Sequence, residues 1–189
     1  MIDSADSVLR PILIAAIHTG MRRGEILELP WRAVDLTRKE ITVEASTAKT
    51  GRKRVIPLTA TLHGALSELR TSRMVTTLDG SDIVFTYPDG APVTVDMLLK
   101  MMASALLRCT GIPKGKKPDV TFHCLRHTAA SLMVQNGMSL FDVARILGHK
   151  TLAMTMRYAH FAPDAVRGSL AQFDRALTEP GALAPAQVR

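Results

Sequence analysis

Residues 40–45 alternate polar and apolar side chains, and this two-residue period restricts the segment to one kind of structure. Successive side chains of a β-strand point to opposite faces, so the alternation predicts a half-buried strand. Residues 54–58 are a second strand candidate, and the basic turn at residues 49–52 lies between the two. Together these segments predict a β-hairpin. A short third strand is expected at residues 83–85.

The other segments carry helical signals. In residues 6–18 the apolar side chains Val8, Ile12, Ala15 and Ala16 share one face, and Gly20 follows as a stop. Further helices are expected at residues 22–29, 60–70, 94–109, 121–136, 139–147 and 163–177, with Thr94, Thr121 and Ser139 as N-caps and a short helix holding Tyr158. The predicted fold is therefore mainly α with a small antiparallel β-sheet, an α+β class.

Length and composition narrow the class of protein. A chain of 189 residues predicts one domain, which we place at residues 1–178, followed by a disordered tail at 179–189. A net charge of +7 favours nucleic acid or an anionic membrane surface as partner. The longest apolar run, residues 11–17, is too short to span a membrane. Two cysteines without metal-site spacing indicate reduced thiols, no metal and a cytoplasmic protein.

Two arginines lie near the starts of expected helices, where an anion can bind. His123 and Arg126 are spaced i, i+3 near the start of one expected helix, so they share a face. A helix N-terminus also attracts phosphate. Arg22 follows a Thr-Gly pair at another expected helix start, and Glu25, three residues on, can hold its guanidinium in place. Each pattern alone is more often a solvated polar surface than a site.

Basic residues gather in two further segments. Lys49 lies at the expected hairpin turn, with Arg52, Lys53 and Arg54 after it. A basic hairpin tip can enter a DNA groove and present a lysine to a phosphate, although lysines also keep exposed sheet edges soluble. The loop at residues 111–119 adds three cations suited to phosphate contacts, Lys114, Lys116 and Lys117.

His149 and Tyr158 complete an ordered series with the residues above. His149 follows Gly148 at the end of an apolar helix, where a histidine is also common for dipole reasons. Arginines clamp phosphate, histidines move protons and a tyrosine hydroxyl can attack phosphorus, so the series predicts a phosphodiester-breaking site. His127 and His160 flank these residues, and we interpret both as structural or solvent-facing.

The order and spacing of these residues resemble those of the tyrosine recombinases, or phage-type integrases. The segments that carry the resemblance are Thr19-Gly20-Met21-Arg22-Arg23-Gly24-Glu25, Ala48-Lys49-Thr50-Gly51, His123-Cys124-Leu125-Arg126-His127, Leu147-Gly148-His149 and Tyr158. The resemblance extends over residues 6–177 and implies a tyrosine recombinase catalytic-domain fold. Nothing in the sequence corresponds to the N-terminal core-binding domain of the family, so a catalytic domain alone is expected.

The resemblance also implies a role for each residue. Tyr158 is the expected nucleophile, giving a 3′-phosphotyrosyl link, and Arg22 and Arg126 grip the non-bridging oxygens. Lys49 protonates the leaving 5′-oxygen, and His123 is the base for Tyr158. His149 is a further phosphate donor, and Glu25 supports Arg22 without taking part in the chemistry. The reaction is expected to need neither metal nor ATP, and no cofactor is expected.

The expected partners are double-stranded DNA and, on paired sites, three further copies of the chain in a tetramer assembled from free monomers. Residues Val166, Leu170, Phe173 and Leu177 form an apolar stripe that can dock on the same domain or on a neighbouring subunit. Two other functions remain open: a type IB topoisomerase-like relaxing enzyme, and a non-catalytic DNA-binding regulator derived from an integrase. A recombinase exchanges strands between two duplexes, whereas a topoisomerase-like enzyme relaxes one. A covalent protein–DNA adduct would exclude a non-catalytic regulator.

Overall fold

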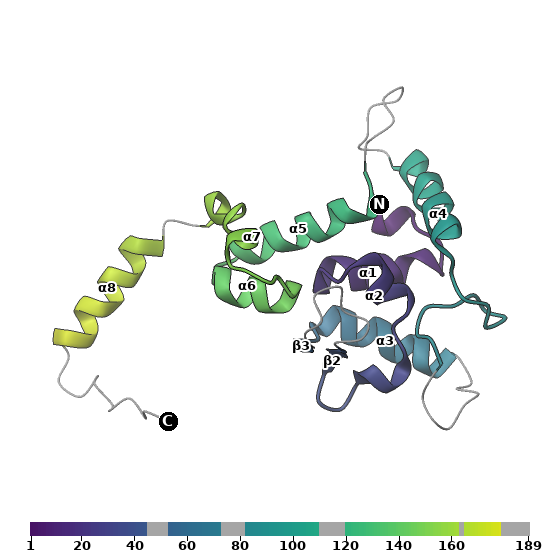
Figure 1. The fold of residues 1–189 in the computed structure, drawn as a ribbon, viewed down its shortest axis with the longest axis horizontal. Helices are drawn as coiled ribbons and strands as arrows, with labels where there is room; N and C mark the ends of the chain where they lie inside the picture. The colour runs from purple at the N-terminus through teal and green to yellow at the C-terminus, as the bar shows by residue number, and fades with distance from the viewer. Residues whose placement is uncertain (45–52, 73–81, 110–119, 163–164, 179–189) are drawn as a thin grey trace.

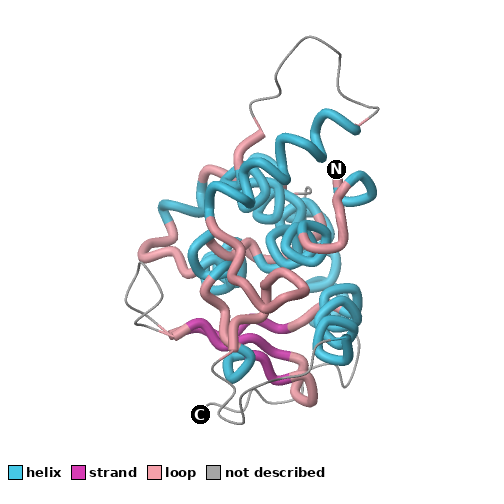
Figure 2. Tube along the Cα trace, turned by 90° about the vertical axis from the view of Figure 1, so that its right-hand side faces the viewer, coloured by secondary structure: helices cyan, strands magenta, loops and turns pink. Residues whose placement is uncertain are grey.

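The computed structural model describes residues 1–44, 53–72, 82–109, 120–162 and 165–178, the last range by its backbone alone at residues 165–169, 172 and 176. These ranges are mainly helical, with one small antiparallel sheet at the edge of the helices (Figures 1 and 2). The predicted α+β class is confirmed. With η for a 3-10 helix, the elements are η1 Ile2–Ser4, α1 Leu9–Thr19, α2 Arg23–Leu27, η2 Trp31–Ala33, β1 Val34–Asp35, β2 Glu40–Val43, β3 Arg54–Pro57, α3 Ala60–Ser72, α4 Val95–Arg108, α5 Phe122–Gln135, α6 Leu140–Leu147, α7 Ala153–Met156, η3 Ala159–Phe161 and α8 Ala165–Thr178.

The sheet is a meander in the order β1–β2–β3. Ile41 of β2 pairs with Ile56 of β3, and both side chains are buried against the helices. The predicted pairing of these two strands is confirmed, whereas the turn between them, residues 45–52, lies outside the described residues. Strand β1, in which Val34 pairs with Ile41, was not predicted, because two residues are too few to show an alternation.

The strand predicted at residues 83–85 is wrong. Ile83 forms only an isolated antiparallel bridge with Pro30. The N–H of Val84 donates to the carbonyl oxygen of Leu29 at 2.8 Å, so the two segments do lie side by side. Proline has no N–H to donate, and a ladder therefore cannot continue through Pro30.

Helix α1 lies at the centre of the main hydrophobic core, in contact with α2, α3, α4 and α5 (Figure 1). Of the predicted apolar face, Ile12, Ala15 and Ala16 are buried and Val8 is partly buried. Leu9 and Leu13 of the same helix are buried as well. A second, smaller cluster joins α5 and α6 to the segment after α7, and it consists of Ala130, Val134, Val143, Leu147 and Tyr158. Helix α5 therefore contributes to both clusters.

The three predicted N-caps lie at helix starts, and two of them make the capping hydrogen bond. The Thr94 hydroxyl accepts from the N–H of Met97 at 3.3 Å, and the Ser139 hydroxyl from the N–H of Asp142 at 3.1 Å. Thr121 precedes α5 without such a bond. Local hydrogen bonding therefore fixes where α4 and α6 begin.

Helices α1 and α6 both end at a glycine in the left-handed conformation. Gly20 follows α1 with φ 62°, and Gly148 follows α6 with φ 65°. A Cβ built at Gly20 would collide with the Leu147 side chain, so the C-terminal ends of the two helices lie against each other. This arrangement brings their last carbonyl groups together.

Helix α8 stands apart from the other helices (Figure 1). Leu170, Phe173 and Leu177 of the predicted stripe are 59%, 61% and 59% exposed. The fourth member of the stripe, Val166, and the predicted tail at residues 179–189 lie outside the described side chains. None of the helices among the described residues has both the length and the apolar character needed to cross a membrane.

We expect Gly20→Ala to destabilise the protein and Gly64→Ala to stabilise it. A Cβ on a left-handed residue costs about 1–2 kcal/mol, and at Gly20 it also displaces Leu147. Gly64 lies inside α3 with open space where a Cβ would be, and alanine is favoured there by about 1 kcal/mol. Thermal unfolding followed by circular dichroism measures both changes. Equal melting temperatures for the two variants would contradict the close approach of α1 and α6.

Candidate active site

The carboxylate of Glu25 joins two arginines from different elements. It follows Arg22 by one helical turn, and its side chain is only 2% exposed. Its Oε1 accepts from an N–H of the Arg22 guanidinium at 3.1 Å, and its Oε2 accepts from the Arg22 backbone N–H at 2.8 Å. Arg54 of β3 donates to the same two oxygens at 3.1 and 2.6 Å. The predicted contact between Glu25 and Arg22 is therefore present, with Arg54 as a second partner.

Burial and ion pairing act in opposite directions on Glu25. Burial raises the pKa of this carboxyl, whereas the hydrogen bonds from Arg54 and from the Arg22 backbone, together with both positive charges, lower it further than burial raises it. The folded-state pKa of Glu25 is therefore below its ordinary value. The carboxylate is charged at neutral pH and fixes both guanidinium groups.

Arg54 does not occupy the position that the sequence indicated. We predicted it as a DNA-binding cation of the hairpin, but its side chain is 7% exposed and points inward. Besides Glu25 it donates from Nε to the carbonyl oxygen of Ile146 at 2.9 Å. A Cβ on Gly148 would approach the Arg54 side chain to 3.0 Å, so the glycine leaves the room that the guanidinium fills. Arg54 therefore connects β3 to α2 and to the end of α6.

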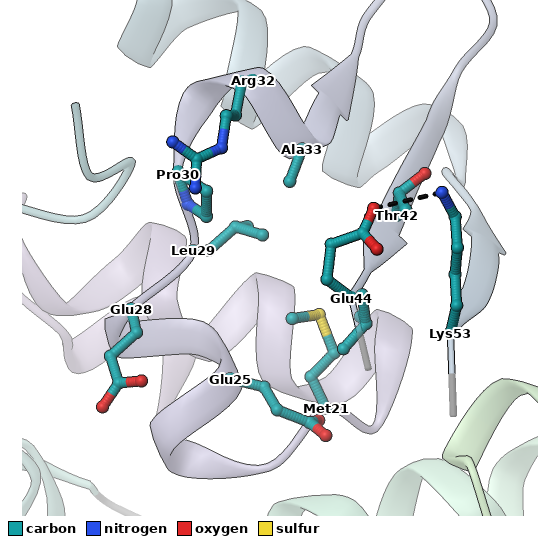
Figure 3. A pocket seen from close by; sticks show the side chains of 11 residues that line it. Met21, Glu25, Glu28, Leu29, Pro30, Arg32, Ala33, Thr42, Glu44 and Lys53 are labelled. Carbon is teal, nitrogen blue, oxygen red and sulfur yellow. Dashed lines mark ion pairs between the residues drawn. The ribbon is translucent and has the colours of Figure 1, made fainter. Parts of the chain in front are cut away.

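The other predicted DNA-binding residues are either exposed or not described. Lys53 lies on the surface and pairs with Glu44 at 3.1 Å, as the dashed line in Figure 3 shows. Arg52, Lys114, Lys116 and Lys117 lie outside the described residues, and so does the predicted catalytic acid Lys49.

A pocket of about 330 Å³ opens beside this ion pair (Figure 3). Its lining includes Met21, Glu25, Glu28 and Lys53, but none of Arg22, Arg126, His149 or Tyr158. The pocket therefore shares Glu25 with the candidate site but is not formed by its arginines, histidine and tyrosine. Among the described residues, no three histidine, cysteine, aspartate or glutamate side chains gather in a group that could hold a metal ion.

Arg126 of α5 is buried between two helix ends. One terminal nitrogen donates to the carbonyl oxygen of Gly20 at 2.7 Å, and the other donates to that of Leu147 at 2.8 Å. Burial and the nearby charge of Arg22 lower the pKa of Arg126 to about 10, so it stays charged at neutral pH. A guanidinium has five N–H donors, and the two carbonyls fix its plane. A second cation close to Arg22 makes this region attractive to an anion.

His149 lies just after the left-handed Gly148. Its Nδ1 is 2.7 Å from the hydroxyl oxygen of Thr155, and Thr155 is fully buried. Burial and the charges of Arg126 and Arg22 lower the pKa of His149 to about 4. At neutral pH the ring is therefore uncharged, and any hydrogen bond that it gives to an anion comes from a neutral N–H.

Tyr158 follows α7 and is not part of it, contrary to the short helix predicted around it. The residue is 5% exposed, and its ring packs in the second hydrophobic cluster. Its hydroxyl oxygen lies 2.6 Å from Nδ1 of His127. Burial raises the pKa of the Tyr158 phenol, and the charges of Arg157 and Arg126 partly oppose this. The hydroxyl is therefore protonated at neutral pH.

His127 was predicted to be structural or solvent-facing, whereas the structure places it against the predicted nucleophile. His123, the residue predicted as base, is exposed, and its ring meets the His127 ring edge to face at 4.6 Å between centroids. The spacing i, i+4 puts the two histidines on one face of α5. That spacing is the signal in the sequence that could have included His127.

The sequence of the chain is similar to that of the phage integrase family. The sequence profile of the phage integrase family matches residues 2–164. The integrase of Salmonella phage P22 is 28% identical over 176 residues, which are 92% of this chain and 44% of the phage protein. A tyrosine recombinase XerC-like protein of Caldanaerobacter subterraneus is 28% identical over 186 residues, with 82% and 46% of the two chains covered. The chain thus spans about half the length of these relatives.

The fold is similar to that of a solved catalytic domain. The catalytic domain of bacteriophage HP1 integrase superposes with a TM-score of 0.63 at 25% identity, covering 94% of this chain and 90% of that one. The predicted fold and family resemblance are both confirmed.

We expect Arg54→Met to lower the free energy of unfolding by about 3 kcal/mol, because it leaves the buried Glu25 carboxylate with one partner in place of two. Lys53→Met is the matched control on the neighbouring residue, and loss of its exposed ion pair should cost under about 1 kcal/mol. Urea unfolding measures both. Equal effects of the two substitutions would contradict the structural role of Arg54.

The pH dependence of the Arg54→Met effect follows from the lowered pKa of Glu25. A carboxylate whose folded-state pKa is depressed stabilises the fold fully above its unfolded pKa of about 4.3 and loses this contribution as pH falls through the folded value. The difference in stability between wild type and Arg54→Met should therefore be greatest near neutral pH and shrink on acidification. A stability difference that stays constant with pH would contradict the lowered pKa of Glu25.

Proposed function

We propose a DNA-cleaving and DNA-rejoining activity for this chain, which belongs to the phage integrase family. In this proposal it is the catalytic domain of a tyrosine-type site-specific recombinase, acting on double-stranded DNA. The observation that carries the proposal is the convergence of two arginines, a neutral histidine and a buried tyrosine. Arg126 donates to the carbonyl oxygens of Gly20 and Leu147, which precede Arg22 and His149 by two residues each, and Leu147 packs in one hydrophobic cluster with Tyr158.

Tyr158 is the nucleophile in this proposal. Its phenolic oxygen bonds to the phosphorus of a DNA phosphodiester, the bond from phosphorus to the 5′-oxygen breaks, and a 3′-phosphotyrosyl link remains. Splitting one displacement into two through a covalent intermediate keeps the energy of the phosphodiester for rejoining. Attack by a 5′-hydroxyl on the same phosphorus reverses the step and releases the tyrosine.

Arg22 and Arg126 hold the non-bridging oxygens of the phosphate. The charge on these oxygens rises in the transition state, and donors already in place stabilise it without reorganisation. Glu25 fixes the first arginine, and the carbonyls of Gly20 and Leu147 fix the second. The supports are buried, so both guanidinium groups reach the phosphate pre-oriented.

His149 adds a neutral donor. The Thr155 hydroxyl can donate a hydrogen bond to Nδ1 of His149. The proton of the neutral ring is then on Nε2, which faces away from Thr155. A neutral donor binds the phosphate without adding to the repulsion between Arg22 and Arg126. Lys49, which lies outside the described residues, is proposed as the acid that protonates the leaving 5′-oxygen.

Tyr158→Phe is expected to abolish covalent attachment to DNA and leave DNA affinity nearly unchanged. The hydroxyl is needed for attack, whereas binding to DNA is dominated by phosphate contacts. The assay uses duplexes selected by the chain from a randomised library and nicked near the centre, so that cleavage traps the protein on DNA in a denaturing gel. Tyr87→Phe removes the other tyrosine of the chain and is the matched control. A trapped adduct formed by Tyr158→Phe would contradict the assignment of Tyr158 as the nucleophile.

The tetramer expected from the sequence remains a proposal, which the exposed face of α8 supports. We propose that α8 docks on a neighbouring copy of the chain when two sites are brought together. The described side chains of the stripe are unburied in the single chain, and burying a large apolar side chain fully yields about 1.5–3 kcal/mol. Docking in trans therefore has a driving force that the isolated chain does not use.

We expect Phe173→Asp to weaken assembly on paired sites at least about tenfold, in line with the loss of one buried aromatic side chain. Binding to a single site should stay as in wild type. Ala171→Asp adds the same charge to an exposed position off the stripe and is the matched control. Band shifts on one-site and two-site duplexes measure assembly. A sharp fall in the melting temperature of the free chain would show that α8 packs on its own domain.

A further inference from the structure

His127 and Tyr158 form a hydrogen bond that neither the motif residues nor the proposed roles include. Nδ1 of His127 lies 2.6 Å from the Tyr158 hydroxyl oxygen, a distance typical of a short O–H···N bond. The two rings are tilted by 48° with centroids 5.9 Å apart. The contact joins the second turn of α5 to the segment that enters η3, and those two elements pack together. It involves the atom that would react with phosphorus.

The direction of this bond follows from the protonation of both partners. Burial lowers the pKa of His127, and the neighbouring His123, Arg157 and Arg126 lower it further. The ring is therefore neutral at neutral pH, and Nδ1 can accept. Tyr158 keeps its proton, because burial raises the pKa of the phenol. The phenol thus donates to Nδ1, and the ring proton of His127 resides on Nε2.

We propose that His127 is the catalytic base that takes the phenolic proton when Tyr158 attacks phosphorus. This inference rests on the proposed function and names the proton acceptor within it. As the bond from oxygen to phosphorus forms, the proton passes from the hydroxyl to Nδ1, and His127 becomes an imidazolium. The leaving 5′-oxygen takes a separate proton from the acid of the site. Rejoining returns the first proton from His127 to the phenolic oxygen.

The role of base therefore moves from His123 to His127. His123 is exposed and contacts the His127 ring edge to face, whereas His127 reaches the phenol directly. The edge-to-face contact restricts rotation of the His127 ring about its Cβ–Cγ bond. His123 is a positioning residue for this step, and its own exposed ring stays available to DNA.

The charges around His127 make the transfer depend on bound substrate. In the free protein the titratable and charged neighbours are His123 and Arg126 on α5, Arg157 and Tyr158 next to η3, and His149 after α6. The positive charges among them oppose a further charge on His127. A phosphate held by Arg126 offsets them, so the pKa of His127 rises when the scissile phosphate is in place. The nucleophile is then deprotonated only where it has a phosphorus atom to attack.

Replacing His127 by asparagine distinguishes a catalytic base from a residue that only accepts a hydrogen bond. The Oδ1 atom of asparagine can stand where Nδ1 of His127 stands and accept from the phenol, but it cannot take a proton near neutral pH. We expect His127→Asn and His127→Ala to lose about 10²–10⁴-fold in the rate of adduct formation on the nicked duplexes. If His127 only positioned Tyr158, His127→Asn would keep the wild-type rate.

The pH profile gives a second readout that a structural defect would not produce. Between pH 7.5 and 9 the wild-type rate should change little, because a bound phosphate only offsets the lowering of the His127 pKa and leaves the base neutral in this range. In His127→Asn the rate should rise about tenfold per pH unit, because solvent hydroxide must then remove the phenolic proton. His123→Asn should keep the flat wild-type profile. Melting temperatures of the variants show whether each is folded.

The outcomes distinguish this inference from the function on which it depends. No adduct with the wild-type chain, or an adduct that survives in Tyr158→Phe, contradicts the proposed function itself. An adduct in wild type, with His127→Asn and His127→Ala matching its rate and profile, overturns only the role of His127. Faster cleavage by both variants would show that the hydrogen bond stores the tyrosine in a resting position, and this also overturns the proposal.

Discussion

The buried carboxylate of Glu25 is the constraint on which the rest of the site depends. A charged group with 2% of its side chain exposed is tolerated only when its partners are well placed, and here two guanidinium groups satisfy both oxygens. One guanidinium belongs to the candidate phosphate-binding Arg22. The other, from Arg54, continues to the carbonyl of Ile146 and thereby connects the sheet to the end of α6.

Arg126 extends the same principle across the helices. Its two carbonyl partners, Gly20 and Leu147, lie at the ends of α1 and α6, where backbone carbonyls have no helical partner and the helix dipole is negative. The arginine thus satisfies groups that a helix leaves open and is held in plane by them. Burial, together with the positive charge gathered in this way, lowers the pKa of His127 and of His149 and keeps both rings neutral. The same positive charge therefore attracts an anion and adds to the effect of burial on the two histidines.

Much of the fold could be predicted from the sequence because its signals are local. The alternation at residues 40–45, the caps Thr94 and Ser139 and the glycine stops each act within a few residues, and each predicted element they mark is present. Strand β1 and the failed strand near Ile83 depend on pairing with distant segments. No periodicity within so few residues could reveal those partners.

The candidate site was predictable in its residue types and less so in its contacts. Arg54 has the sequence context of a hairpin cation, and only the space left by Gly148 shows why it turns inward. His127 lies one residue after Arg126 and was interpreted as a neighbour of the motif. Its contact with Tyr158 crosses 31 residues of chain and depends on how η3 packs against α5. Which histidine meets the phenol is a property of tertiary packing.

Mass spectrometry of the trapped protein–DNA complex tests the central claim most directly. Trypsin cuts after Arg157 and Arg167, so the predicted nucleophile lies alone in the peptide of residues 158–167. After nuclease digestion of the trapped DNA, we expect a nucleotide remnant linked through phosphate to Tyr158 in this peptide. A remnant on Tyr87 or on any other peptide, with residues 158–167 recovered unmodified, would contradict it.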